Sequence, residues 1–141
     1  MTRDEIVALF ARRQRAWDNI DAAALARDYS DEGTLESPMA GGVAAGRDAI
    51  ERLYRTYFAA FPDFKFEQEA LLIDGDQAVQ LGTASGTDTG GFMGMAPTRR
   101  RMNMRLAVFH TLRDGQIARA RAVYDFTGVL IQVGVLKAKP V

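Results

Sequence analysis

The sequence predicts an α+β domain whose helices come first and whose antiparallel strands follow. Apolar residues recur at helical spacing in the first part of the chain, and from Phe64 onward the spacing changes to a period of two. A long sheet with few helices must curl to cover its apolar face. We therefore expect a half-barrel whose mouth is closed by helices, with a cavity between the two layers. The 141 residues are expected to form a single domain over residues 1–141.

Three helices are expected in the N-terminal half. Thr2 and Glu5 form a T-x-x-E capping box, which predicts a helix over residues 2–18. Asp21 can cap a short second helix over residues 22–29. The third helix has one continuous apolar stripe, which consists of Ile50, Leu53, Tyr54, Tyr57, Phe58 and Phe61.

The strands are expected at residues 34–36, 64–73, 77–87, 99–112 and 116–125. Gly75 and Gly115 supply the positive φ that the two tight turns between long strands require. Residues 39–46 and 88–97 are predicted to be glycine-rich loops. Thr127 is expected to cap a short C-terminal turn.

Composition excludes several classes of site. The chain has no cysteine and one histidine, which rules out disulfide scaffolds, thiolate nucleophiles and metal sites built on thiolate or imidazole. We expect no metal. Eighteen basic residues balance eighteen acidic ones, so a basic surface for nucleic acid is not expected. The one dense basic run, residues 99–101, is predicted to be a solvated strand start, with an anion contact as the alternative.

The N-terminal residues enter a polar, amphipathic stretch at once. No secretory apolar region follows them, and no apolar run reaches the ~18 residues of a membrane span. The expected location is therefore the cytoplasm, with no membrane partner.

Several segments, taken in order, resemble one known family. They are residues 90–98 (GGFMGMAPT), 113–117 (RDGQI), 124–125 (YD) and 130–134 (LIQVG), preceded by Trp17, residues 24–26 (ALA), 45–50 (AGRDAI) and 59–63 (AAFPD). Together they are similar to the SnoaL-like polyketide cyclase branch of the NTF2-like superfamily. The resemblance covers nearly the whole chain.

The resemblance implies a cone-shaped NTF2-like fold, in which three N-terminal helices cap a curved antiparallel sheet, and a homodimer formed through the sheet. It also implies a cofactor-independent small-molecule enzyme of the cyclase or isomerase type, with general acid/base chemistry on an apolar carbonyl substrate in a cavity. Two alternatives stay open: a non-catalytic protein that binds an apolar ligand, and an assembly protein that uses the fold only to dimerise.

The resemblance implies that Asp125, at the end of the last strand, is the catalytic acid/base. The residues themselves leave two interpretations open, because Asp125 is expected on the same strand face as Arg121. Asp125 is either a pocket carboxylate or a surface residue paired with Arg121. If both side chains face the cavity, Arg121 is better suited to anchor an enolate or carboxylate.

His110 is the second catalytic candidate, since the resemblance implicates a histidine on the preceding strand in some members. A two-residue turn at residues 114–115 pairs His110 with Arg119, so Asp125 lies about 20 Å along the same face. A direct His–Asp dyad is therefore not expected. The alternatives for His110 are a packed or rim histidine and a polar contact to a long ligand.

The predicted substrate-binding residues are aromatic, methionine and arginine side chains. They are Trp17, Tyr54, Phe58, Phe92, Met93, Met95, Met104 and Arg121. The aromatic ones can equally belong to the core. The segment 92–95 is predicted either to act as a lid or to form an ordinary wide hairpin.

Overall fold

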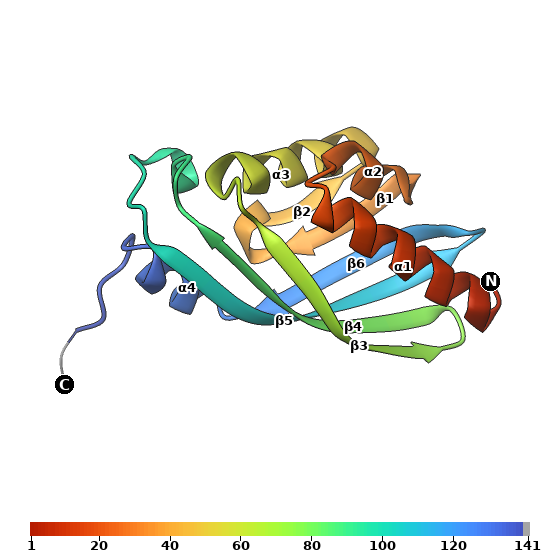
Figure 1. Ribbon diagram of the computed structural model, residues 1–141. Coiled ribbons are helices and arrows are strands. Elements are labelled where there is room, and N and C mark those ends of the chain that lie inside the picture. The colour runs from red at the N-terminus through yellow and green to blue at the C-terminus, as the bar shows by residue number, and fades with distance from the viewer. Residues whose placement is uncertain (140–141) are drawn as a thin grey trace.

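A curved six-stranded sheet forms one layer of the protein, and α1, α2 and α3 lie across one of its faces (Figure 1). The computed structural model describes residues 1–139. Within that range the helices are α1 (Arg3–Asp18), α2 (Ala22–Arg27), α3 (Arg47–Ala60) and α4 (Phe126–Gln132), with short 3-10 turns η1 (Pro38–Ala40) and η2 (Phe92–Gly94). The strands are β1 (Tyr29–Ser37), β2 (Gly42–Ala45), β3 (Lys65–Asp74), β4 (Gln77–Thr87), β5 (Arg101–Arg113) and β6 (Gln116–Tyr124). The predicted α+β class is confirmed.

The strand order is β2-β1-β6-β5-β4-β3, and one pair departs from the expected antiparallel sheet. β1 lies parallel to β6, whereas every other neighbouring pair in this sheet is antiparallel. Most of the chain separates β1 from β6, so no tight turn dictates their relative direction. β1 also begins before the expected strand at 34–36, and β2 lies inside the segment predicted to be a loop at 39–46.

The two long N-terminal helices form as their apolar patterns predict. The Thr2 side chain accepts a hydrogen bond from the Glu5 backbone nitrogen and the Glu5 side chain accepts one from Thr2, which completes the capping box of α1. Ile50, Tyr54 and Phe58 on α3 are buried against the sheet. The core therefore lies between these helices and the sheet face that they cover.

A β-bulge in β6 decides which side chains of that strand face the helices. Thr111 of β5 pairs with Arg119 and Leu112 pairs with Ile117, which leaves Ala118 without a partner. The extra residue reverses the alternation along the strand, so His110 pairs with Ala120 and not with Arg119 as predicted. After the bulge, the even-numbered residues face inward.

The last helix, α4, packs against β5. The Asp125 side chain caps this helix by accepting a hydrogen bond from the Gly128 nitrogen at 2.8 Å, a role that was predicted for Thr127. Gln132 on α4 bonds the backbone of Asn103 in both directions, at 2.7 and 3.0 Å. None of the helices in residues 1–139 has both the length and the apolar character that a membrane crossing requires.

Candidate functional site

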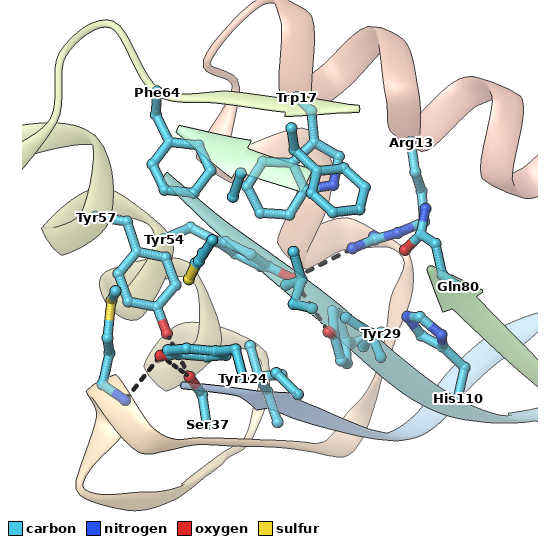
Figure 2. Close-up of a pocket in the computed structure, with 18 residues that line it drawn as sticks. Arg13, Trp17, Tyr29, Ser37, Tyr54, Tyr57, Phe64, Gln80, His110 and Tyr124 are labelled. Carbon is cyan, nitrogen blue, oxygen red and sulfur yellow. Dashed lines mark hydrogen bonds between the residues drawn. The ribbon is translucent and has the colours of Figure 1, made fainter. Parts of the chain in front are cut away.

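A narrow pocket lies between the helices and the covered face of the sheet (Figure 2). The empty space of this pocket, including the solvent space at its mouth, is about 600 Å³. Its walls are mostly apolar and aromatic, with polar groups at a few places. The lining residues are Arg13, Trp17, Tyr29, Leu35, Ser37, Met39, Tyr54, Tyr57, Phe64, Phe66, Gln80, Ala84, Met104, Leu106, Val108, His110, Ala122 and Tyr124.

Trp17 joins the aromatic residues of one wall. Its ring stacks on Phe64 with centroids 5.6 Å apart and meets the edge of Tyr54 at 5.4 Å. Phe66 of β3 lies 5.3 Å away from the same ring. These planar surfaces favour a flat, apolar ligand.

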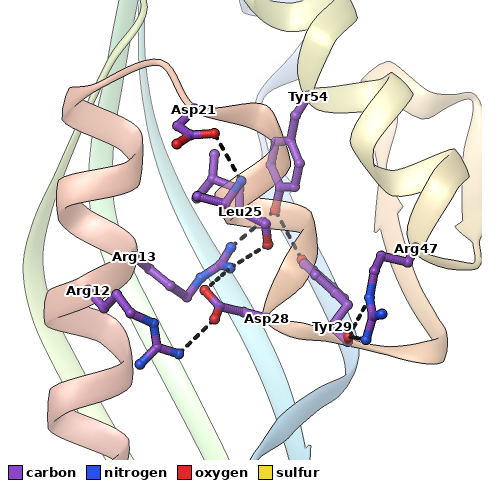
Figure 3. Close-up of polar contacts among 9 residues, drawn as sticks. Arg12, Arg13, Asp21, Leu25, Asp28, Tyr29, Arg47 and Tyr54 are labelled. Carbon is purple, nitrogen blue, oxygen red and sulfur yellow. Dashed lines mark hydrogen bonds and ion pairs between the residues drawn. The ribbon is translucent and has the colours of Figure 1, made fainter.

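The first polar group of the pocket is the Arg13 cluster, which consists of Arg13, Tyr29 and Tyr54 (Figure 3). Arg13 Nη2 donates to the Tyr54 hydroxyl at 3.2 Å, and the Tyr54 and Tyr29 hydroxyls lie 3.1 Å apart. Arg13 Nη1 donates to the Leu25 carbonyl at 2.8 Å. The guanidinium also lies 5.5 Å from the centroid of the Tyr29 ring. Elements α1, α2, β1 and α3 thus converge on one buried cation.

Arg13 is 2% exposed and shares its carboxylate partner. Asp28 accepts from Arg13 at 3.2 Å and from Arg12 at 2.7 Å, so two guanidinium groups face one carboxylate. Burial opposes the charge of Arg13, but Tyr54, Tyr29 and Asp28 outweigh it and raise its pKa. The buried Nε of Arg13 has no hydrogen-bond partner within residues 1–139.

The Arg13 cluster has more hydroxyl hydrogens than acceptors for them among the described residues. Tyr54 accepts from Arg13, and one of the two tyrosine hydroxyls donates to the other. The second hydroxyl hydrogen then has no acceptor among the described residues. Burial raises the pKa of Tyr29 well above its usual range, so that phenol stays protonated. The cluster therefore offers one hydroxyl donor to a bound molecule.

The second polar group is the hydroxyl cluster, which consists of Ser37, Tyr57 and Tyr124. Tyr57 donates to Ser37 Oγ at 3.1 Å, and Ser37 and Tyr124 are also 3.1 Å apart. The Met39 nitrogen donates to Tyr124 at 3.1 Å. Burial raises the pKa values of Tyr57 and Tyr124, so three hydroxyl hydrogens are present and two are used inside the cluster. The third remains available, but no charged side chain takes part in this cluster's hydrogen bonds.

His110 is 2% exposed and lines the pocket on the same side as Arg13 and Gln80 (Figure 2). Its ring meets the edge of Phe10 with centroids 4.8 Å apart. Burial, reinforced by the positive charge of Arg13, lowers the pKa of His110 to about 3, so the imidazole is neutral at pH 7. Its Nδ1 is buried without a hydrogen-bond partner in the described chain.

Eight of the ten predicted site residues fall into three groups. Trp17, Tyr54, Met104 and His110 line the pocket. Phe58 and Phe92 are buried but lie outside its wall, where Phe58 contacts Trp17 at 5.9 Å and Phe92 contacts Phe61 at 5.4 Å. Met93 and Met95, which are 62% and 45% exposed, lie in the loop after β4 and not in the wall.

The expectation of Asp125 and Arg121 as pocket residues is wrong. Asp125 is exposed, and its carboxylate caps α4. Arg121 is also exposed and donates to Glu36 at 2.8 Å. The bulge in β6 explains both placements, because it turns Ala122 and Tyr124 toward the pocket and Arg121 and Asp125 away from it.

Six polar residues of the wall were not among the predicted ones: Arg13, Tyr29, Ser37, Tyr57, Gln80 and Tyr124. For Arg13 the signal was present, because it occupies the helical stripe of Ile6, Leu9 and Phe10 where an apolar side chain is expected. The other five carry no comparable signal in the chain alone. Within residues 1–139, no group of three or more His, Asp or Glu side chains is arranged to hold a metal ion.

The fold is similar to that of several solved structures, three of which come from Streptomyces. TsrD from Streptomyces laurentii has a TM-score of 0.84 at 24% identity, over 96% of this chain and 99% of that one. AclR, a candidate hydroxylase from Streptomyces galilaeus, has a TM-score of 0.83 at 24% identity, over 99% and 87%. IdmH, a candidate polyketide cyclase from Streptomyces antibioticus, has a TM-score of 0.75 at 23% identity, over 91% and 97%.

No curated protein sequence matches the chain. The family described as SnoaL-like polyketide cyclase matches residues 8–133, which is most of the sequence. Because this match covers well over half of the sequence and the architecture is α+β, the chain belongs to the SnoaL-like polyketide cyclase family.

Proposed function

We propose that this protein is a cofactor-independent enzyme of the cyclase or isomerase type that acts on an apolar carbonyl compound. One observation carries the proposal: an aromatic pocket holds a neutral imidazole together with hydroxyl donors that lack acceptors among the described residues. A neutral imidazole can take a proton, and a hydroxyl donor can stabilise the oxygen that becomes negative.

The proposed reaction needs no reactant other than the substrate. His110 accepts a proton from the carbon beside the carbonyl group, and the C–H electron pair moves to form an enolate whose oxygen is held by a wall hydroxyl. In an isomerisation the proton returns to another carbon. In a ring closure the enolate carbon forms a bond to a second carbonyl carbon, and the resulting alkoxide takes the proton back. The lowered pKa of His110 makes it a weak base, so the hydroxyl donor must stabilise the enolate strongly.

Deuterium exchange tests this proposal without knowledge of the natural substrate. The probe is 2-indanone, a flat ketone with acidic hydrogens, whose exchange in D₂O is followed by proton NMR. We expect the protein to accelerate exchange over buffer and His110→Gln to lower the acceleration on the order of 100-fold. Asp125→Asn is the matched control, since Asp125 lies outside the wall, and it should keep the full rate. Exchange at the buffer rate, or loss of exchange in Asp125→Asn alone, would contradict the proposal.

A non-catalytic binding protein is the second candidate. The observation in its favour is that no Asp or Glu side chain within residues 1–139 lines this pocket, which leaves the weakly basic His110 as the proton acceptor. This candidate predicts that the pocket binds 2-indanone while the exchange rate stays at that of buffer.

We also propose that two copies pair through the outer face of the sheet. Leu72, Leu81, Phe109 and Val123 are exposed there. They lie on adjacent strands, because Leu81 pairs with Ala107, which pairs with Val123, and Phe109 pairs with Val79, which pairs with Leu72. Such a patch favours association. Sedimentation should show a dimer that Phe109→Asp dissociates and that Val43→Asp, an exposed edge-strand control, preserves. A monomeric native protein would contradict the pairing.

A further inference from the structure

We propose that the pocket takes its ligand as an oxyanion, a carboxylate or an ionised phenol or enol, with the charged oxygen at the Arg13 cluster. The inference deepens the proposed function, and it rests on that function only in assuming that the same pocket binds the ligand. It names a chemical class, flat acidic compounds, and fixes which end of the pocket receives the acidic group.

The charges around the pocket support an anionic occupant. Among the described residues, Arg13 is the one charged side chain in this wall, and no carboxylate accompanies it there. Its partner Asp28 lies outside the wall and is shared with Arg12, so the group Arg12–Asp28–Arg13 carries two positive charges and one negative charge. A positive excess beside a narrow, poorly solvated space attracts an anion.

A hydroxyl donor of the Tyr29–Tyr54 pair lies beside the positive charge of Arg13. One hydroxyl hydrogen of the Tyr29–Tyr54 pair has no acceptor on the described protein, and Tyr54 is already polarised by the hydrogen bond from Arg13 Nη2. A hydroxyl whose oxygen accepts from a cation is a stronger donor. An oxyanion accepting this hydrogen would meet both a donor and a neighbouring positive charge.

The neutral state of His110 points the same way. Burial and the neighbouring charge of Arg13 keep the imidazole uncharged, so a cationic ligand would meet the positive charge of Arg13, and an anionic ligand would meet no negative group among the described residues of the wall. The Ser37–Tyr57–Tyr124 hydroxyl cluster also offers a donor, but without an associated charge. The Arg13 cluster is therefore the end that discriminates an anion from a neutral oxygen.

Two single-ring probes of equal shape test the inference on the native protein. Benzoate carries an anionic oxygen, and benzamide is its neutral counterpart. Calorimetry should show that benzoate binds at least about tenfold more tightly than benzamide, a ratio equivalent to about 1.4 kcal/mol. A third probe, 4-nitrophenol, separates phenols from carboxylates, because its ionised form has its own absorption band. If the site also accepts ionised phenols, binding should lower the pKa of this probe.

Three variants locate the effect. Arg13→Met should bring the benzoate-to-benzamide ratio within about threefold of one, while Arg15→Met, an equal charge change on the exposed side of α1, should leave the ratio unchanged. If Arg13→Met does not fold, Tyr54→Phe keeps the ring and should lower the ratio by about threefold or more.

These outcomes test the oxyanion inference separately from the proposed enzymatic function. Benzamide binding as tightly as benzoate, or binding of neither probe, overturns the oxyanion inference whatever the deuterium-exchange result is. An unchanged ratio in both Arg13→Met and Tyr54→Phe overturns its placement at the Arg13 cluster. A benzoate preference in a protein that does not accelerate exchange supports the inference and contradicts the enzymatic function.

Discussion

The two ends of the pocket contain the same functional group in different electrostatic surroundings. At one end, the hydroxyls of Tyr29 and Tyr54 are backed by the buried guanidinium of Arg13. At the other end, Tyr57 and Tyr124 bond to Ser37 and to a backbone nitrogen, all of which are uncharged. Both ends can donate to a carbonyl oxygen, but only the first places a positive charge beside it.

This difference implies that a bound molecule has a preferred direction. A ligand with two oxygen atoms can bond both clusters, and the more negative oxygen is expected at the Arg13 cluster. The apolar wall of Trp17 and Phe64 restricts such a ligand to a flat shape. The charged end therefore sets orientation, and the aromatic wall sets shape.

The largest expected effect concerns the two arginines that share Asp28. Arg13→Met removes a buried cation and leaves the Leu25 carbonyl and the Tyr54 hydroxyl without their donor, so it should lower the free energy of unfolding by about 3 kcal/mol. Arg12→Met removes a 56% exposed partner and should cost less than about 1 kcal/mol. Urea unfolding measures the free energy of unfolding of both variants. Equal losses of free energy would contradict the expected difference between the buried Arg13 and the exposed Arg12.

The next effect compares the two hydroxyl donors in the exchange of 2-indanone. Tyr54→Phe should slow the accelerated exchange by roughly 100-fold, because it removes a donor that is next to the positive charge. Tyr124→Phe should slow it by about tenfold at most, because its cluster is neutral. A larger effect of Tyr124→Phe would place the enolate oxygen at the opposite end from the one proposed.

A third effect is the pH dependence of stability, which arises from the burial of His110 and, to a smaller extent, from the nearby charge of Arg13. The pKa of His110 is about 3 in the folded protein and about 6.5 when unfolded, so the unfolded chain binds a proton between these values and the folded protein does not. The native protein should therefore lose about 2 kcal/mol of His110-dependent stability as the pH falls from 6.5 to about 5. His110→Gln should lack this part of the slope. Parallel pH curves for both proteins would show that the histidine titrates normally.

The smallest effect concerns Asp125, which was predicted from the sequence to lie in the pocket but caps α4 in the structure. Asp125→Ala removes the helix cap of α4 and should cost about 1 kcal/mol, whereas Asp125→Asn keeps an acceptor and should cost less. Thermal melts of the two variants measure this difference. Equal melting temperatures would mean that the cap contributes nothing.

The sequence predicted the fold better than the site for a physical reason. Periodic apolar patterns over α1 and α3, and glycines at the two tight turns, specify local structure directly. The outcome at Asp125 depended on one unpaired residue, Ala118, and no feature of a period-two pattern reveals a bulge in advance.

The pocket's polar residues illustrate the same limit. Arg13 could have been recognised because it interrupts an apolar helical stripe. The pairing of Tyr29 with Tyr54, and of Ser37 with Tyr124, joins residues 25 and 87 positions apart, and only the fold brings them together.

A crystal structure with benzoate tests the central claim most directly. The two polar ends of the pocket predict a single orientation, with a carboxylate oxygen within hydrogen-bond distance of Tyr29 or Tyr54 and the ring beside Trp17. Benzoate with its carboxylate at Ser37 and Tyr124, or bound on the surface near Asp125 with the pocket unchanged, would contradict the account.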